Sequence, residues 1–188
     1  MNAPLPLAAR IQLPRHFRVE HADAETLAAA LRLRRAVFCD EQGLFVGDDR
    51  DAIDAHAMML VARPVTSDAE ASDDADLGPV VGTVRIHTLA PRVWQGSRLA
   101  VAADFRRVGA IGGALIQLAV RSAATLGCDR FVAQVQARNV ALFRRLHWES
   151  VDTISLHGQP HHLMEADLAH YPAFATGEAM RVEVRRGL

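Results

Sequence analysis

The sequence predicts an α/β fold with a mixed sheet, and three patterns carry that prediction. Residues 57–62 and 80–86 are apolar runs of strand length that suggest the two arms of a hairpin. Residues 98–102 and 130–135 indicate two further strands, and an apolar helix with leucines at helical spacing lies between them. Because a strand–helix–strand crossover joins parallel strands, the sheet should contain both parallel and antiparallel pairs.

Shorter patterns predict the other elements. The remaining expected elements are a strand at 17–20, a helix capped by Asp23 that ends near Gly43, a short helix opened by Asn139, and strands at 151–156 and 162–166 joined through Gly158 and Pro160. Residues 180–185 alternate like a strand. That last segment has three alternatives: it packs on its own sheet, swaps into a partner subunit, or frays.

Length and composition indicate one domain without bulk attraction to polyanions. The chain has 188 residues, a formal net charge of −1 and 50% hydrophobic residues, so neither nucleic acid nor an anionic membrane is favoured as a partner. No apolar run is long enough to span a bilayer, and the first 15 residues lack the apolar core of a signal peptide. A cytoplasmic protein is therefore expected. Its two cysteines are too few for a disulfide framework.

The domain prediction has three parts. Residues 1–16 form an N-terminal extension, 17–168 the domain, and 169–188 a C-terminal extension. Residues 63–79 carry five acidic side chains and no basic one after Arg63, which predicts a mobile acidic surface insertion. A functional acidic arm is the alternative.

An arginine-led, glycine-rich turn precedes the long helix and has the features of a phosphate site. Arg106 and Arg107 lead into Gly109, Gly112 and Gly113, where a strand gives way to the helix. The first amides of a helix have no helical partner and lie at the positive end of its dipole, so they can face an anion. An ordinary helix start with glycines for close packing is the alternative.

Two well-known phosphate loops are excluded. Walker A needs a lysine, and all 21 basic residues of this chain are arginines. The dinucleotide fingerprint needs G-x-G-x-x-G, which the spacing of Gly109, Gly112 and Gly113 does not match.

The turn resembles a known acyl-coenzyme A signature. Arg107-x-x-Ala110-x-Gly112 is similar to the Q/R-x-x-G-x-G/A pattern of the GNAT N-acyltransferase superfamily, with Ala110 in place of a glycine. Four further segments resemble GNAT enzymes related to acyl-homoserine-lactone synthases: Leu33 to Gln42, Gly82 to Arg85, Asn139 to Trp148, and Gly158 to Met164. The resemblance covers residues 17–168, and in particular the chain resembles a bacterial GNAT group found in gene clusters with a nitrilase.

The resemblance implies a sheet of about seven strands with helices on both faces. The sheet would splay open between the central parallel strands that end near Val101 and Val135, and the pantetheine of acetyl-CoA would lie in the split. The residues implied to bind this cofactor are the main chain of Leu99, Ala100 and Val101, the cations Arg106 and Arg107, the amides of Val108, Gly109, Ala110, Ile111, Gly112 and Gly113, and Asn139 and Phe143 from the far side.

The implied activity is transfer of an acyl group, most simply acetyl, from coenzyme A to the amine of a small molecule. In many such enzymes a tyrosine at the position of Phe143 protonates the departing thiolate, and Phe143 has no ionisable group. Two alternatives follow: a non-catalytic acyl-CoA-binding partner subunit, or an acyltransferase with a lactone-synthase-like acceptor. Homodimerisation stays open.

Candidates for the base and for acceptor contacts lie outside the turn. Glu41 at the end of the first helix and His161 after Pro160 are the candidate bases. The candidate acceptor contacts are Arg34, Asp54, His56 and Trp94, with structural anchoring and loop capping as the alternatives for the first three. No metal site is expected, because His161 and His162 point to opposite faces of a strand and no other ligand joins them and His157.

Overall fold

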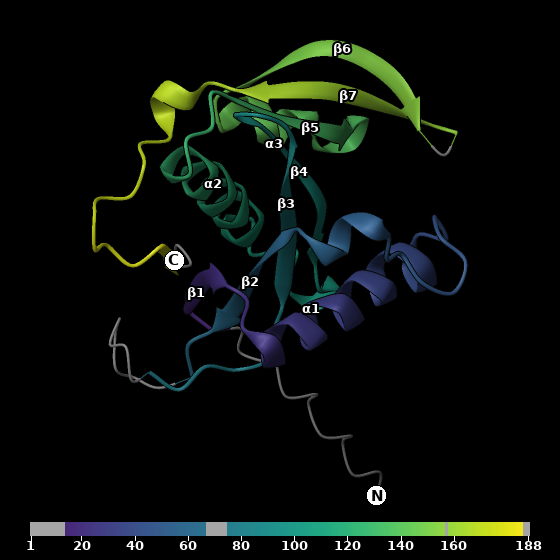
Figure 1. The fold of residues 1–188 in the computed structure, drawn as a ribbon. Coiled ribbons are helices and arrows are strands. Elements are labelled where there is room, and N and C mark those ends of the chain that lie inside the picture. The colour runs from purple at the N-terminus through teal and green to yellow at the C-terminus, as the bar shows by residue number, and fades with distance from the viewer. Residues whose placement is uncertain (1–13, 67–74, 157, 186–188) are drawn as a thin grey trace, which may run out of the picture.

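A computed structural model describes residues 14–66, 75–156 and 158–185, and it shows an open sheet flanked by helices (Figure 1). The described strands form one eight-stranded sheet in the order β6-β7-β5-β4-β3-β2-β1-β8. Neighbouring strands are antiparallel except for the parallel pair β4 and β5. The strands are β1 His16–His21, β2 Met58–Pro64, β3 Gly82–Ala90, β4 Val93–Val101, β5 Arg130–Gln136, β6 Trp148–Leu156, β7 Gln159–Ala166 and β8 Arg181–Arg185. The predicted mixed α/β fold is confirmed. The described sheet has eight strands, whereas the resemblance implied about seven.

The two long helices cover opposite faces of the sheet. Met59 and Val61 of β2 pack with Ala30 of helix α1, Ala24–Arg35. Leu60 and Ala62 join the larger core beneath helix α2, Ala110–Thr125. The division follows from strand geometry, since successive side chains point to opposite faces. The short helix α3, Val140–Arg145, lies against β6 at the other end of the sheet.

Helix α1 begins and ends as its sequence predicts. The Asp23 carboxylate accepts a hydrogen bond from the Thr26 amide, and the Thr26 hydroxyl accepts one from the Asp23 amide, which satisfies two otherwise unpaired donors. After Arg35 the helix widens into a π-helix, Ala36–Glu41, and Gly43 ends it with φ of +61°. π-Helical turns are rare and often occur at functional sites.

A bulge in β4 opens the sheet. Thr83 faces Ala100 and Arg85 faces Ser97 across β3 and β4, so Arg98 and Leu99 together oppose one residue, and Arg98 has φ of +54°. Bulges bend a strand and increase its twist. β4 and β5 accordingly pair only from Val93 to Gly96 with Arg130 to Ala133, although both strands continue beyond that point. The splayed central strands that the resemblance implied are present.

The C-terminal segment packs on its own sheet. β8 pairs antiparallel with β1, and the Arg18 guanidinium binds the Glu183 carboxylate at 2.8 Å. Figure 1 shows this yellow segment descending beside α2 to reach β1. Of the three alternatives for this tail, the structure shows the first, in which the tail packs on the sheet of its own chain.

The acidic segment 63–79 begins within the sheet. Pro64 ends β2, and Val65 forms an isolated bridge with Leu77, so the two ends of the segment lie together. Its centre, residues 67–74, lies outside the described residues, as does most of the predicted N-terminal extension 1–16. Among the residues described, no helix is both long and apolar enough to cross a membrane.

Candidate functional site

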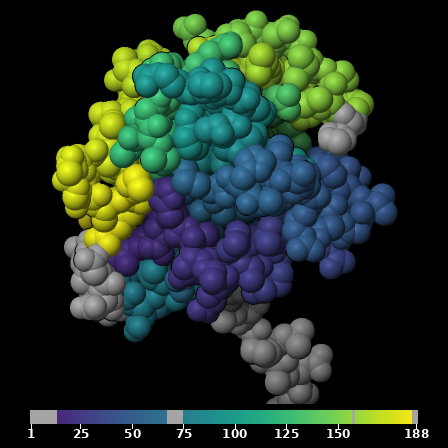
Figure 2. Space-filling model, viewed as in Figure 1, coloured from purple at the N-terminus to yellow at the C-terminus, as the bar shows by residue number. Residues whose placement is uncertain are grey.

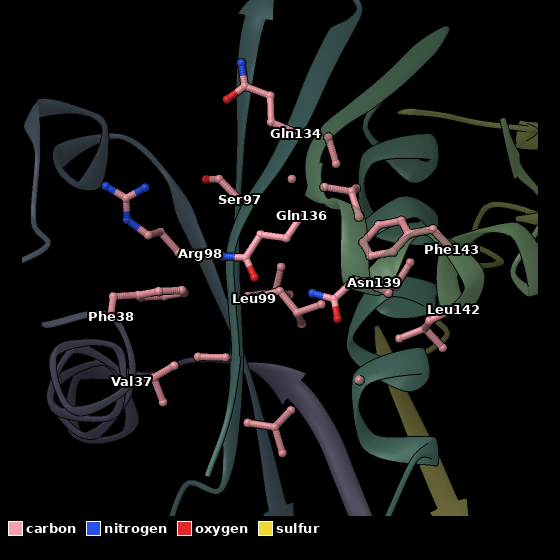
Figure 3. A pocket seen from close by; sticks show the side chains of 18 of the residues that line it. Val37, Phe38, Ser97, Arg98, Leu99, Gln134, Gln136, Asn139, Leu142 and Phe143 are labelled. Atoms are coloured by element: carbon pink, nitrogen blue, oxygen red, sulfur yellow. The ribbon is translucent and has the colours of Figure 1, made fainter. Parts of the chain in front are cut away.

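The split between β4 and β5 opens into a cavity of about 680 Å³. Figure 3 shows Val37, Phe38 and Arg98 on one side of the split and Asn139, Leu142 and Phe143 on the other. The side formed by residues 37–45 is called the π-helix wall, and the side formed by Asn139, Leu142 and Phe143 is called the α3 wall. In Figure 2 the segment that follows α1, in blue, lies below the green β6–β7 hairpin, so these two parts flank the same side of the molecule.

The start of α2 opens onto this cavity through its glycines. Val108, Gly109 and Gly112 line the cavity. A Cβ at Gly109 would meet nothing within 4 Å, and one at Gly112 would meet only a Leu142 methyl at 3.9 Å. This open space beside the positive end of a helix dipole fits a phosphate group.

Fewer amides are free here than the sequence predicts. The Val108 amide donates to the Phe105 carbonyl, and the Ile111 amide donates to the Val108 carbonyl, each at 3.0 Å. Helix geometry leaves the amides of Gly109, Ala110 and Gly112 without a helical partner, whereas Gly113 stands far enough along to join the helical ladder. The amides of Val108 and Ile111, which the sequence had predicted to bind an anion, are therefore not free to do so. Two 3₁₀-type hydrogen bonds occupy them, and residue spacing cannot reveal such bonds.

Arg106 and Glu41 are bound to each other at the mouth of the cavity. Arg106 Nε donates to the Val101 carbonyl at 2.9 Å, and its Nη2 donates to Glu41 Oε2 at 2.5 Å. Both side chains line the cavity, whereas Arg107 does not. The predicted phosphate cation and one predicted base thus form an ion pair in this state.

The free edge of β4 borders the split. Leu99, Ala100 and Val101 line the cavity beyond the point where β5 stops pairing. Their main chain can accept an extended ligand as an added strand, as the resemblance implied. The Val101 carbonyl is already held by Arg106.

His161 combines burial with a defined tautomer. Its side chain lines the cavity, lies opposite Gln136 in the β5–β7 ladder and is 7% exposed. Nδ1 lies 3.0 Å from the Gln159 carbonyl oxygen, which can only accept, so Nδ1 carries the proton. Nε2 of the neutral ring is then a proton acceptor.

Phe143 occupies the α3 wall without offering a proton. Its ring is 6% exposed and packs edge-on against Trp148 with centroids 5.0 Å apart. The chain's single tyrosine, Tyr171, donates to the Leu146 carbonyl and accepts from the Trp148 indole. Tyr171 is not among the described residues that line the cavity, so none of them is a phenol.

The predicted acceptor contacts do not line the cavity. Arg34 is fully buried and binds Asp49 at 2.8 Å and Asp54 at 2.6 Å. It is a structural anchor, which was the alternative to a substrate contact. Asp54 joins the capping box that Asp51 begins, His56 follows it in the loop, and Trp94 packs against the α2-side core.

Arg34 belongs to a partly buried network of three arginines and three aspartates that sequence reasoning missed. Arg85 Nη1 binds Asp51 at 2.6 Å, and Arg98 Nε binds Asp49 at 2.9 Å. Burial alone would raise the pKa of Asp54, but hydrogen bonds from Arg34, the Asp51 main chain and Arg85 hold it well below its ordinary value. The network fastens residues 49–54 to the sheet.

Arg98 links this network to the cavity. Its guanidinium lies 4.4 Å from the Phe45 ring centroid, within cation–π distance. Burial lowers the pKa of Arg98, with a further contribution from Arg85. An arginine at positive φ in a bulge leaves no periodic signal that would separate it from its neighbours in the sequence.

Comparison with known proteins places the chain in a family. The family model described as the acetyltransferase (GNAT) family matches residues 29–148, so the chain belongs to the GNAT family. A search of curated proteins gives no match.

Solved structures show the same fold. Escherichia coli ElaA is 19% identical, with a TM-score of 0.62 over 80% of this chain and 98% of that one. The acyl-homoserine lactone synthase BjaI, solved with SAM and isopentyl-CoA, is 16% identical, with a TM-score of 0.61 over 79% and 82%. The ribosomal-protein-alanine N-acetyltransferase of Brucella melitensis is 19% identical, with a TM-score of 0.57 over 78% and 97%.

Proposed function

We propose that this GNAT protein transfers an acyl group, most simply acetyl, from coenzyme A to the amine of a small molecule. The observation that carries the proposal is the coincidence of a free strand edge, an open glycine-lined helix start and a fixed imidazole around one cavity. The location of the protein in the cytoplasm and a link to nitrilase gene clusters stay predictions.

In this proposal the donor is held mainly by main-chain groups. The amides of Gly109, Ala110 and Gly112 face the pyrophosphate, Arg106 adds positive charge, and Leu99 to Val101 bind the pantetheine arm. Bound in this way, the coenzyme presents its thioester carbonyl in the split. Asn139 and Phe143 close the far side.

His161 serves as the base. The acceptor nitrogen attacks the thioester carbon, the C–N bond forms, the C–S bond breaks, and His161 Nε2 takes the proton that the nitrogen loses. The thiolate leaves and takes its proton from water. This route fits a site in which Phe143 replaces the usual tyrosine.

The proposal is tested by two measurements on the whole chain. We expect acetyl-CoA to raise the melting temperature, since a ligand of the folded state stabilises it, and a panel of amines to release free CoA. A raised melting temperature without CoA release from any amine would instead support the non-catalytic binding subunit. A product that carries an acyl-homoserine lactone would support the lactone-synthase-like acceptor.

Replacing the base should slow the reaction. His161→Gln is expected to lower kcat/KM by about 100-fold, because the glutamine side chain cannot take the proton that the acceptor nitrogen loses. The matched control is His162→Gln, because His162 points to the other face of β7 and bonds Ser150 Oγ at 2.7 Å. Equal loss in both variants, or an unchanged kcat/KM in His161→Gln, would remove His161 from this role.

Breaking the Glu41–Arg106 pair should strengthen donor binding. Glu41→Gln removes a carboxylate that competes with phosphate for Arg106. Because both side chains are more than a third exposed, the pair is worth less than about 1 kcal/mol, and the dissociation constant of CoA should fall by no more than about 5-fold. Titration calorimetry measures the change. Weaker binding in Glu41→Gln would show that Arg106 does not meet the phosphates.

A further inference from the structure

We infer that the acceptor is an amine whose remaining part is uncharged and rich in hydrogen-bonding groups, such as an amide, an ester or an alcohol. The inference rests on the proposed function and specifies the substrate class of the same cavity. It comes from the side chains of the acceptor chamber, defined as the part of the cavity bounded by the π-helix wall and by Gln95, Ser97, Gln134 and Gln136.

The alternation of β5 places a row of amides in this chamber. Ala133 and Val135 belong to the core beneath α2, so Gln134 and Gln136 point to the opposite face. The Gln136 amide donates to Gln42 Oε1 on the π-helix wall at 3.3 Å. Figure 3 shows Gln134, Gln136 and Ser97 around the split, with Arg98 and Phe38 on the side of the π-helix wall.

These amides retain capacity for a ligand. A glutamine side chain has two N–H donors and an oxygen with two lone pairs. The contact between Gln136 and Gln42 uses one donor and one acceptor. The remaining amide donors and acceptors of Gln42 and Gln136, together with those of Gln95 and Gln134, suit a ligand that both donates and accepts hydrogen bonds. Phe38 and Phe45 add an apolar surface beside them.

Three of the four charged side chains that line the cavity are already paired with an opposite charge. The charged side chains among the described residues that line the cavity are Glu41, Arg98, Arg106 and Arg138. Asp49 and Asp51 hold Arg98, and Glu41 holds Arg106. Arg138 is exposed and precedes Asn139, after the end of β5.

Arg138 lies outside the residues that define the chamber, so a charged acceptor body inside the chamber would find no unpaired counter-ion among the described residues that bound it. An amino acid carboxylate would have to lose water while Arg98 stays bound to two aspartates, and a second ammonium would find Glu41 occupied by Arg106. Unpaired charge is costly to remove from water, whereas an amide can exchange its hydrogen bonds with the glutamines. The chamber should therefore bind amines whose remaining part is uncharged more tightly than amines that carry a further charge.

The test compares matched ligands. With the protein saturated by CoA, ligand-observed NMR measures the binding of leucinamide, leucine and 1,4-diaminobutane. We expect leucinamide to bind at least about 10-fold more tightly than the other two. Equal or tighter binding of leucine or of the diamine would overturn the inference. The assay measures binding, so it remains decisive even if no amine releases CoA and the proposed transferase activity fails.

A positive charge placed among the chamber's glutamines should reverse the preference for leucinamide over leucine. Gln134→Arg puts a guanidinium on an exposed cavity-lining position and is expected to make leucine bind more tightly than leucinamide. The control Gln134→Met keeps the length and removes the amide, so it should weaken leucinamide without favouring leucine. An unchanged preference in Gln134→Arg, or loss of leucine binding in Arg138→Gln with wild-type Gln134, would place recognition elsewhere.

Discussion

Gly112→Asp is expected to abolish the rise in melting temperature that acetyl-CoA produces. Gly112 lines the cavity in the first turn of α2, and a Cβ there has open space apart from one Leu142 methyl at 3.9 Å. The new carboxylate would stand beside the proposed pyrophosphate position. Like charges placed together at a binding site cost several kcal/mol, which corresponds to roughly a 1,000-fold loss of affinity.

Gly112→Ala separates charge from bulk. The alanine methyl fits the same space, and alanine favours a helix over glycine by about 1 kcal/mol. This variant should be at least as stable as the parent protein and keep most of its affinity for CoA. If Gly112→Asp still binds acetyl-CoA with its parental affinity, the diphosphate does not lie at this helix start.

Arg34→Met should lower the stability of the fold more than Glu41→Gln or Arg138→Gln. Arg34 is fully buried and binds Asp49 and Asp54, so its loss leaves one buried and one partly buried carboxylate short of a partner. Removing one member of a buried ionic network typically costs about 3–5 kcal/mol. For a domain of this size we expect the melting temperature to fall by roughly 6–20 °C, measured by calorimetry.

The control for this prediction is a surface pair. Arg50 binds Asp48 at 2.6 Å, but both side chains are exposed, so Arg50→Ala should cost less than about 1 kcal/mol. A similar small effect for Arg34→Met would show that Arg85 and Arg98 alone satisfy the three aspartates.

The same network makes a signed prediction with pH. The pKa of Asp54 is held below its ordinary value in the folded protein. Its contribution to stability is therefore present above the ordinary aspartate pKa of about 3.9 and is lost as pH falls below it. The difference in unfolding free energy between wild type and Arg34→Met should accordingly narrow below about pH 4.

Much of the fold could be predicted because it depends on local patterns. The capping signal at Asp23, the apolar crossover helix and the apolar runs of β2 and β5 all lie in the predicted places. β4 was predicted to begin at Arg98, and it begins at Val93. The missed part, Val93 to Ser97, contains two polar residues and a glycine, so it lacks the apolar alternation that indicates a strand.

The cavity was less predictable, since it depends on contacts between distant segments. The resemblance implied a site at the start of α2, and Gly109 and Gly112 do line the cavity. The pairing of Arg106 with Glu41 spans 65 residues, and that of Arg34 with Asp49 depends on how the loop after the π-helix returns to the sheet. No spacing rule relates such residues, so the sequence left Arg34 open between a substrate contact and a structural anchor.

Glu41 and Gln42 have a mechanical consequence for the whole domain. These two neighbours reach opposite lips of the gap, Glu41 to Arg106 after β4 and Gln42 to Gln136 at the end of β5. The end of the π-helix that follows α1 therefore contacts both halves of the sheet. While both contacts hold, any widening of the gap must move the end of this helix as well.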